Sequence, residues 1–225
     1  VAFVPQNLKA FIEGLEVETD QAFIYLSIRE MAHTRLFKHS KWLRDAIVGQ
    51  VANYASGITI DNDRIHEIAE DFNATNPDEL KRALETGAFI AARSEDQQLA
   101  LDRIETMLAL IEGWVDVVTE EATKLLPKAA AISEAVRRRR ATGGPAEQTF
   151  GTIVGLELRP RKLREAAEMW RKIGSTAGSD KRDSLWDHPD LVPSAEDILD
   201  PTNLIAKLNG TETQGDEMDQ ALREL

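Results

Sequence analysis

Three polar residues on one predicted helix are the first candidates for chemistry. Hydrophobic periodicity predicts a helix over residues 19–37, and spacings of three and four place Arg29 and His33 on one mostly apolar stripe. Glu30 lies beside them. A guanidinium and an imidazole in such a stripe need acidic partners, because burying an unpaired charge costs several kcal/mol. The sequence therefore predicts acidic side chains facing this helix.

A second helix supplies two candidate partners. Residues 107–118 are apolar nearly all round except for Glu112 and Asp116, which predicts a buried helix segment. The two carboxylates are four residues apart and project in one direction. Without nearby cations they would be strongly unfavourable, so we expect them to pair with the two cations of the first helix. Gly113 costs helix stability but allows another chain segment to approach closely.

Both segments resemble the metal-binding helices of gluzincin-type zinc metallopeptidases. Arg29-Glu30-Met31-Ala32-His33 is similar to the H-E-x-x-H motif with its first histidine replaced, and Glu112-Gly113-Trp114-Val115-Asp116 is similar to the E-x-x-x-D helix. The chain as a whole resembles a bacterial family of zinc-dependent metalloproteases of uncertain substrate, sometimes linked to deazaflavin coenzyme biosynthesis. The wider similarity covers residues 1–5, 36–37, 42–45, 112–114, 137–145 and 155–160.

This resemblance implies a role for each residue of the two motifs. His33 would be the second zinc ligand, Glu112 the third, and Glu30 the general base that takes a proton from metal-bound water. Asp116 would orient the first ligand from behind. That ligand is Arg29 here, and a guanidinium has no lone pair to offer a metal and repels it. We therefore expect Arg29 to fill part of the metal space and to bridge Glu112 and Asp116, with no cofactor, or with Zn where the site still functions.

Three functions remain open on these residues. The first is a catalytically inactive binding or structural relative of the metallopeptidases. The second is an active metal-dependent hydrolase of the peptidase type, and the third is a helical protein-interaction domain. Among the other histidines, His39 and His66 are expected at the surface, and His188 is a further ligand candidate. Trp114 and Trp170 are expected in the core.

Composition excludes several classes of partner and site. A net charge of −12 argues against nucleic acid, because polyanion binding needs a basic surface, and the run Arg137–Arg140 is expected to be a solvated helix end. The 225 residues contain no cysteine and no apolar stretch long enough to cross a membrane, so a cytoplasmic protein is expected. The expected partner is a peptide, protein or small molecule, and a homo-oligomer is possible.

The expected fold class is all-α: a zincin/gluzincin-like helical domain with little or no sheet. Residues 1–209 are expected to form a single helical metallopeptidase-like domain, with possible lobes meeting near 141–146, followed by an acidic flexible tail over 210–225. The chain does not begin with Met, so processing, trimming by proteolysis and a missing segment upstream of residue 1 are all possible. Helices are predicted over 6–15, 19–37, 40–56, 61–72, 77–86, 94–125, 127–140, 146–156 and 160–172, and a loop over 174–183.

Overall fold

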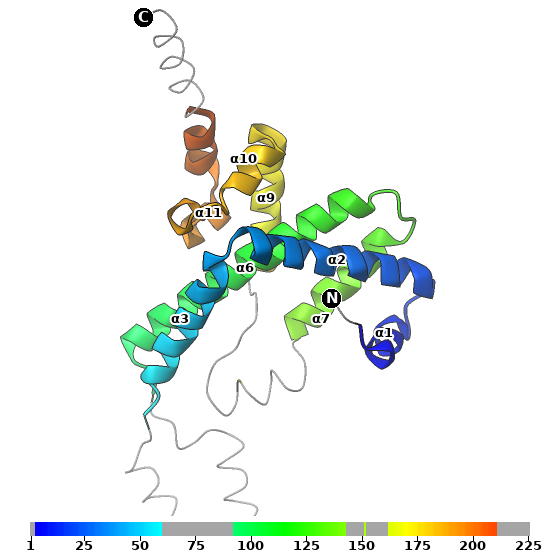
Figure 1. Ribbon diagram of the computed structural model, residues 1–225, viewed down its shortest axis with the longest axis horizontal. Coiled ribbons are helices and arrows are strands. Elements are labelled where there is room, and N and C mark those ends of the chain that lie inside the picture. The colour runs from blue at the N-terminus through cyan, green and yellow to red at the C-terminus, as the bar shows by residue number, and fades with distance from the viewer. Residues whose placement is uncertain (1–2, 60–91, 143–150, 152–161, 211–225) are drawn as a thin grey trace, which may run out of the picture. The chain divides into compact units, whose positions relative to one another are not determined.

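The computed structural model of the 225-residue chain describes residues 3–59, 92–142, 151 and 162–210 (Figure 1). It divides into two compact units. The first unit comprises Val1–Arg44, Ala109–Val136 and Lys162–Leu225, and the second comprises Asp45–Leu108 and Arg137–Arg161. The predictions for residues 61–72, 77–86, 143–146 and 211–225 fall outside the described residues, as does all of the helix predicted over 146–156 except residue 151. The single-domain assignment stays a prediction.

The fold is all-α, as the sequence predicts. The elements in order are α1 (Pro5–Ile12), α2 (Thr19–His39), α3 (Trp42–Ser56), α6 (Glu95–Thr123), α7 (Ala129–Thr142), α9 (Leu163–Ala177), α10 (Ser179–Ser184), the 3-10 helix η1 (Pro189–Leu191) and α11 (Ala195–Leu199). Residues 202–210 are also helical. The described ranges contain no strand. None of the described helices is both long and apolar enough to cross a membrane.

Local signals in the sequence explain where several of these helices begin. Proline has no backbone N–H to lose, and Pro5 accordingly lies at the start of α1. The negative charge of Asp20 in the first turn of α2 interacts favourably with the positive end of the helix dipole. The hydroxyl of Ser194 accepts from the backbone N–H of Asp197, whose carboxylate accepts from the backbone N–H of Ser194. This reciprocal capping box fixes the start of α11.

The first unit has a core built around α9, which contacts both α10 and α11. Trp170 of α9 is fully buried and stacks on Trp186, with ring centroids 5.5 Å apart. The indole N–H of Trp170 donates a hydrogen bond of 2.9 Å to the carbonyl of Leu110 in α6, so the buried donor is satisfied. Trp114 of α6 is also buried. Both tryptophans expected in the core lie there.

Helices α6 and α9 approach most closely at Gly113. A Cβ added at this glycine would lie 2.8 Å from both the Cβ of Ala166 and the backbone nitrogen of Ala167. No side chain fits at that separation without movement of backbone. The expectation that Gly113 permits a close approach is confirmed, and the approaching segment is α9.

The prediction of a loop over residues 174–183 is wrong. Helix α9 continues to Ala177, and after the single residue Gly178, which has a φ of 95°, the short helix α10 begins at Ser179. Arg182 of α10, 2% exposed, makes a tertiary contact by donating to Glu121 at 2.7 Å, and it also donates to its neighbour Asp183 at 2.9 Å. Burial lowers the pKa of Arg182, but its hydrogen bonds to Asp183 and Glu121 outweigh burial and leave the pKa raised.

The second unit has a small core between α3 and the first half of α6. Its buried side chains are Tyr54, Ala100, Leu101 and Ile104. The buried side-chain amide of Gln97 donates to the carbonyl of Tyr54 at 3.2 Å, which ties the C-terminal part of α3 to α6. Outside this core, Arg138, Arg139 and Arg140 at the end of α7 are exposed, as expected of a solvated helix end.

Candidate functional site

The site lies where α2 faces the part of α6 that belongs to the first unit (Figure 1). Buried residues recur along α2 at spacings of three and four: Ala22, Tyr25, Arg29, Ala32 and Leu36. An arginine therefore occupies a position within the apolar stripe that packs against the rest of the unit. Its side chain is 4% exposed, so its positive charge needs a buried partner.

That partner is Glu112 of α6. Nη2 of Arg29 donates to Oε2 of Glu112 in a close, buried hydrogen bond between residues 83 positions apart in sequence. Nη1 of Arg29 also lies 3.9 Å from Oε1 of Glu30, on the next position of α2. The single positive charge of Arg29 therefore lies near two carboxylates. Glu112 is buried, and the side chain of Glu30 is 42% exposed.

His33 completes the group one turn further along α2. Its Nε2 lies 3.4 Å from the second carboxylate oxygen of Glu112, and its Nδ1 lies 3.7 Å from Oε1 of Glu30. Nδ1 is buried and has no hydrogen-bond partner among the described residues. We call Arg29, Glu30, His33 and Glu112 the Arg29 cluster. Four of the five residues predicted for the site are therefore brought together.

Asp116 has two contacts with residues outside the Arg29 cluster, and its predicted bridge to Arg29 stays a prediction. One of its oxygens accepts from the hydroxyl of Ser133 at 3.4 Å, and the other lies 3.7 Å from Nη2 of Arg171. Arg171 of α9 also donates to Glu120 through two nitrogens, at 3.1 and 3.2 Å. Sequence reasoning missed Ser133 and Arg171, since no periodicity on α6 indicates which residues of α7 and α9 face it.

Neither His39 nor His188 belongs to the Arg29 cluster. His39, the last residue of α2, is exposed and its Nε2 lies 2.6 Å from Oδ1 of Asp187. His188 is exposed and its ring nitrogen accepts from the backbone N–H of Asp190 at the start of η1. His66 lies outside the described residues. His39 therefore lies at the surface, as expected.

Comparison with known proteins assigns the class. A zincin metal centre has a helix with two histidines four residues apart and a glutamate between them, facing a helix that carries a third ligand. Helix α2 has the glutamate and the second histidine of this pattern, Glu30 and His33, and faces Glu112 of α6. The chain matches the zincin-like metallopeptidase family over residues 1–205, and it belongs to this family. No curated protein matches the sequence, and no solved structure matches it either.

The family implies a zinc ion, and the residues of the Arg29 cluster do not fit one. His33 and Glu112 have the donor atoms that zinc takes, but the remaining place is filled by Arg29, whose guanidinium offers only N–H donors. One oxygen of Glu112 accepts from that guanidinium. Within the described ranges, no group of three or more histidine, aspartate or glutamate side chains is placed to hold a metal ion. As arranged, the cluster neutralises Glu112 with a guanidinium.

Proposed function

We propose that this zincin-like protein is inactive as a metallopeptidase and acts as a binding or structural relative, with Arg29 in place of the metal. The observation that supports this is the buried hydrogen bond from Arg29 to Glu112. The carboxylate that the resemblance assigns to zinc is therefore already bound to a guanidinium. Unlike a metal ion, this guanidinium is covalently part of the chain and cannot dissociate. Zinc could bind only after the guanidinium had moved.

Electrostatics favours this arrangement over a half-filled metal site. A zinc ion would add two positive charges beside a guanidinium that keeps its proton under all ordinary conditions. Like charges a few ångströms apart in a buried site repel by several kcal/mol. The two donors that remain, His33 and Glu112, are fewer than the three protein ligands that catalytic zinc sites use.

One observation favours the alternative of an active hydrolase. Glu30 is 42% exposed and lies beside His33, so a substrate could reach it, as a general base must be reached. In this alternative His33 and Glu112 would bind the metal together with a further ligand. Arg29 would then stabilise the oxyanion of the tetrahedral intermediate.

Metal content separates these possibilities. The wild-type protein, the Arg29→His variant and the Arg29→Gln variant are purified without chelators, exposed to zinc, and measured by elemental mass spectrometry. The His variant restores a ligand and removes the charge, whereas the Gln variant only removes the charge. We expect zinc at about one equivalent in the His variant alone, because three donors are needed.

The other outcomes have distinct meanings. Stoichiometric zinc in the wild type would overturn the proposal and favour the active hydrolase. Zinc bound equally by the His and Gln variants would show that charge, and not ligand number, blocks the site. An empty His variant that is still folded would mean that the cluster lacks zincin geometry, which favours a helical interaction domain.

A further inference from the structure

The side of α2 that faces away from the core of the first unit carries a regular stripe of residues. Its members follow one another at alternating spacings of four and three: Asp20, Ile24, Ser27, Met31, Thr34 and Lys38. Residues at these spacings share one face of a helix, and this face is opposite the one that carries the buried residues of α2. At 1.5 Å per residue, the stripe extends over about 27 Å. We call it the outward stripe.

The middle of the outward stripe is uncharged. Ile24 is 45% exposed and Met31 is 55% exposed. Between them lies the small residue Ser27. The hydroxyl of Thr34 donates to the backbone carbonyl of Glu30 at 2.9 Å, so its hydrogen is used within the helix. Apolar side chains that line up on an exposed helix face are characteristic of interaction surfaces.

The two ends of the outward stripe have opposite charges. Asp20 lies in the first turn of α2 and Lys38 in its last turn. Both side chains are exposed, and neither has an ion-pair partner among the described residues. Each charge complements the dipole of α2 itself, but each also remains available to a group of opposite sign on another molecule.

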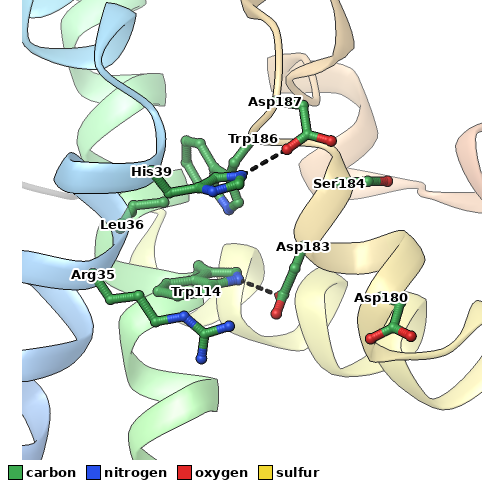
Figure 2. A pocket seen from close by; sticks show the side chains of 9 residues that line it. All are labelled: Arg35, Leu36, His39, Trp114, Asp180, Asp183, Ser184, Trp186 and Asp187. Carbon is green, nitrogen blue, oxygen red and sulfur yellow. Dashed lines mark hydrogen bonds and ion pairs between the residues drawn. The ribbon is translucent and has the colours of Figure 1, made fainter.

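Residues on both sides of the outward stripe make contacts within the chain. On one side Phe23 lies against Phe3, with ring centroids 5.3 Å apart. On the other side Arg35 lines a pocket of about 270 Å³, and Figure 2 shows its side chain extending toward α10, near Trp114. The apolar members of the outward stripe, which lie between these flanks, are about half exposed. The outward stripe is therefore the part of α2 that is open to a partner.

The outward stripe is complementary to itself when two copies of α2 run antiparallel. A two-fold axis level with residue 29 places each member opposite a different one: Asp20 opposite Lys38, Ile24 opposite Thr34, and Ser27 opposite Met31. A small side chain then faces a long one at the centre, and opposite charges meet at both ends. Antiparallel helix dipoles also attract one another. A parallel alignment would instead bring like charges together at each end.

We propose that the outward stripe of α2 is the surface through which two copies of this chain associate, as an antiparallel helix pair. The two-fold symmetry makes each charge pair occur twice. A contact confined to one helix face buries less than the roughly 1,200 Å² of a stable interface, so we expect a dissociation constant of about 10 to 100 µM. The inference is independent of the proposed function, because it does not require Arg29 to exclude a metal.

Sedimentation velocity of the full chain tests the association. Between about 5 and 500 µM, the mass should rise from the 25.1 kDa of one chain toward twice that value. Met31→Arg should weaken association at least about tenfold, because it places two guanidinium groups in the uncharged centre of the pair. Leu125→Arg is the matched control: it changes an apolar residue that is 90% exposed and lies off the outward stripe. It should associate like the wild type.

Charge reversal tests the pairing at the ends. Lys38→Asp and Asp20→Lys should each weaken self-association about tenfold, because like charges then face one another. An equimolar mixture of the two variants should recover association, since every acidic end then meets a basic one. Circular dichroism of each variant verifies that α2 is still helical. Lys124→Asp, which reverses an exposed charge just after α6, should behave like the wild type.

Crosslinking reports the direction of the two helices, and the chain contains no cysteine that would interfere. Asp20→Cys and Lys38→Cys are each treated with a bifunctional maleimide that spans about 8 Å, close to the distance between packed helices. We expect a crosslinked dimer only in their mixture, because the two copies of residue 20 lie about 27 Å apart in an antiparallel pair. A mixture of Lys124→Cys with Lys38→Cys should give no dimer above background.

Three results would overturn the proposal. The first is a chain that stays monomeric up to about 500 µM, well above the expected dissociation constant. The second is equal weakening of association by Met31→Arg and Leu125→Arg. The third is crosslinking of Asp20→Cys with itself in preference to the mixture, which would show a parallel pair. The Arg29→His variant should associate like the wild type, so failure of the metal proposal would leave this result unaffected.

Discussion

The guanidinium of Arg29 lies against the carboxylate of Glu112 in the interior of the first unit, and each provides the counter-charge that the other needs. Neither group could be buried alone at acceptable cost. Since the two residues are on α2 and α6, their contact also fixes how these helices face one another. Removing one partner should therefore affect stability more than most single substitutions.

Arg29→Ala is expected to lower the free energy of unfolding by about 3 to 5 kcal/mol, because Glu112 would be left as an uncompensated buried charge. Chemical denaturation measures this loss. Arg164→Ala is the control: the Arg164 side chain is 71% exposed, and its pair with Glu134 at 3.3 Å should contribute less than about 1 kcal/mol. A loss below about 1 kcal/mol for Arg29→Ala would contradict the structural importance of the pair.

Gly113→Ala is expected to destabilise the protein by about 1 to 3 kcal/mol, because its Cβ would overlap Ala166 and Ala167 of α9. Gly49→Ala provides the comparison. Gly49 is helical like Gly113, but it is exposed, and an added Cβ there meets nothing within 4 Å. It should instead stabilise the protein by about 0.5 to 1 kcal/mol through better helix propensity. Thermal and chemical denaturation should give opposite signs for the two variants, and equal signs would contradict the close helix contact.

Ser40→Ala and Trp42→Phe should be more costly together than their separate losses suggest. The hydroxyl of Ser40 and the indole N–H of Trp42 both donate to the carbonyl of Trp186, at 2.7 and 3.1 Å. Either donor alone satisfies that acceptor, so the hydrogen-bond loss in each single variant should stay near 1 kcal/mol. A double-mutant cycle measures the coupling, and strict additivity would show that the two donors act independently.

Thr202→Ala is expected to raise the pKa of Asp200 toward its ordinary value. The hydroxyl of Thr202, at 2.6 Å, is the main cause of the lowered pKa of Asp200, and the backbone N–H of Thr202 adds to it. Because the pKa of Asp200 is lowered in the folded state, the ionised carboxylate stabilises the fold above pH 3.8, the ordinary pKa of the group. This contribution to stability is lost as the pH falls through the pKa of the folded state. Carboxyl titration by NMR checks this. Thr106→Ala, which removes a hydroxyl bonded to the carbonyl of Asp102, should leave the titration of Asp200 unchanged.

Periodicity and burial predicted much of the fold. The helices predicted over 19–37 and 94–125 correspond to α2 at Thr19–His39 and α6 at Glu95–Thr123, because both present long apolar stripes. The contact between Arg29 and Glu112 could also be anticipated, since a charged residue within each stripe requires a partner and few are available.

The remaining features depend on tertiary contacts that no local pattern indicates. Helix α10 has the sequence of a polar loop, and it is held by the bonds from Arg182 to Glu121, 61 positions earlier, and to Asp183. For the same reason the partners of Asp116 were missed, because Arg171 is a surface residue of α9 in any sequence reading.

The stacked indoles of Trp170 and Trp186 give the protein an optical signature of its own packing. Their rings are 5.5 Å apart at an interplanar angle of 28°, and both are buried. The electronic transitions of two aromatic rings couple when the rings lie this close together. The coupling contributes to circular dichroism only while the mutual orientation of the rings is fixed. A compact state that keeps its helices but loses this orientation would keep its helical spectrum and lose the aromatic one. The first unit therefore contains a spectroscopic reporter that distinguishes ordered packing from mere helix content, without any added label.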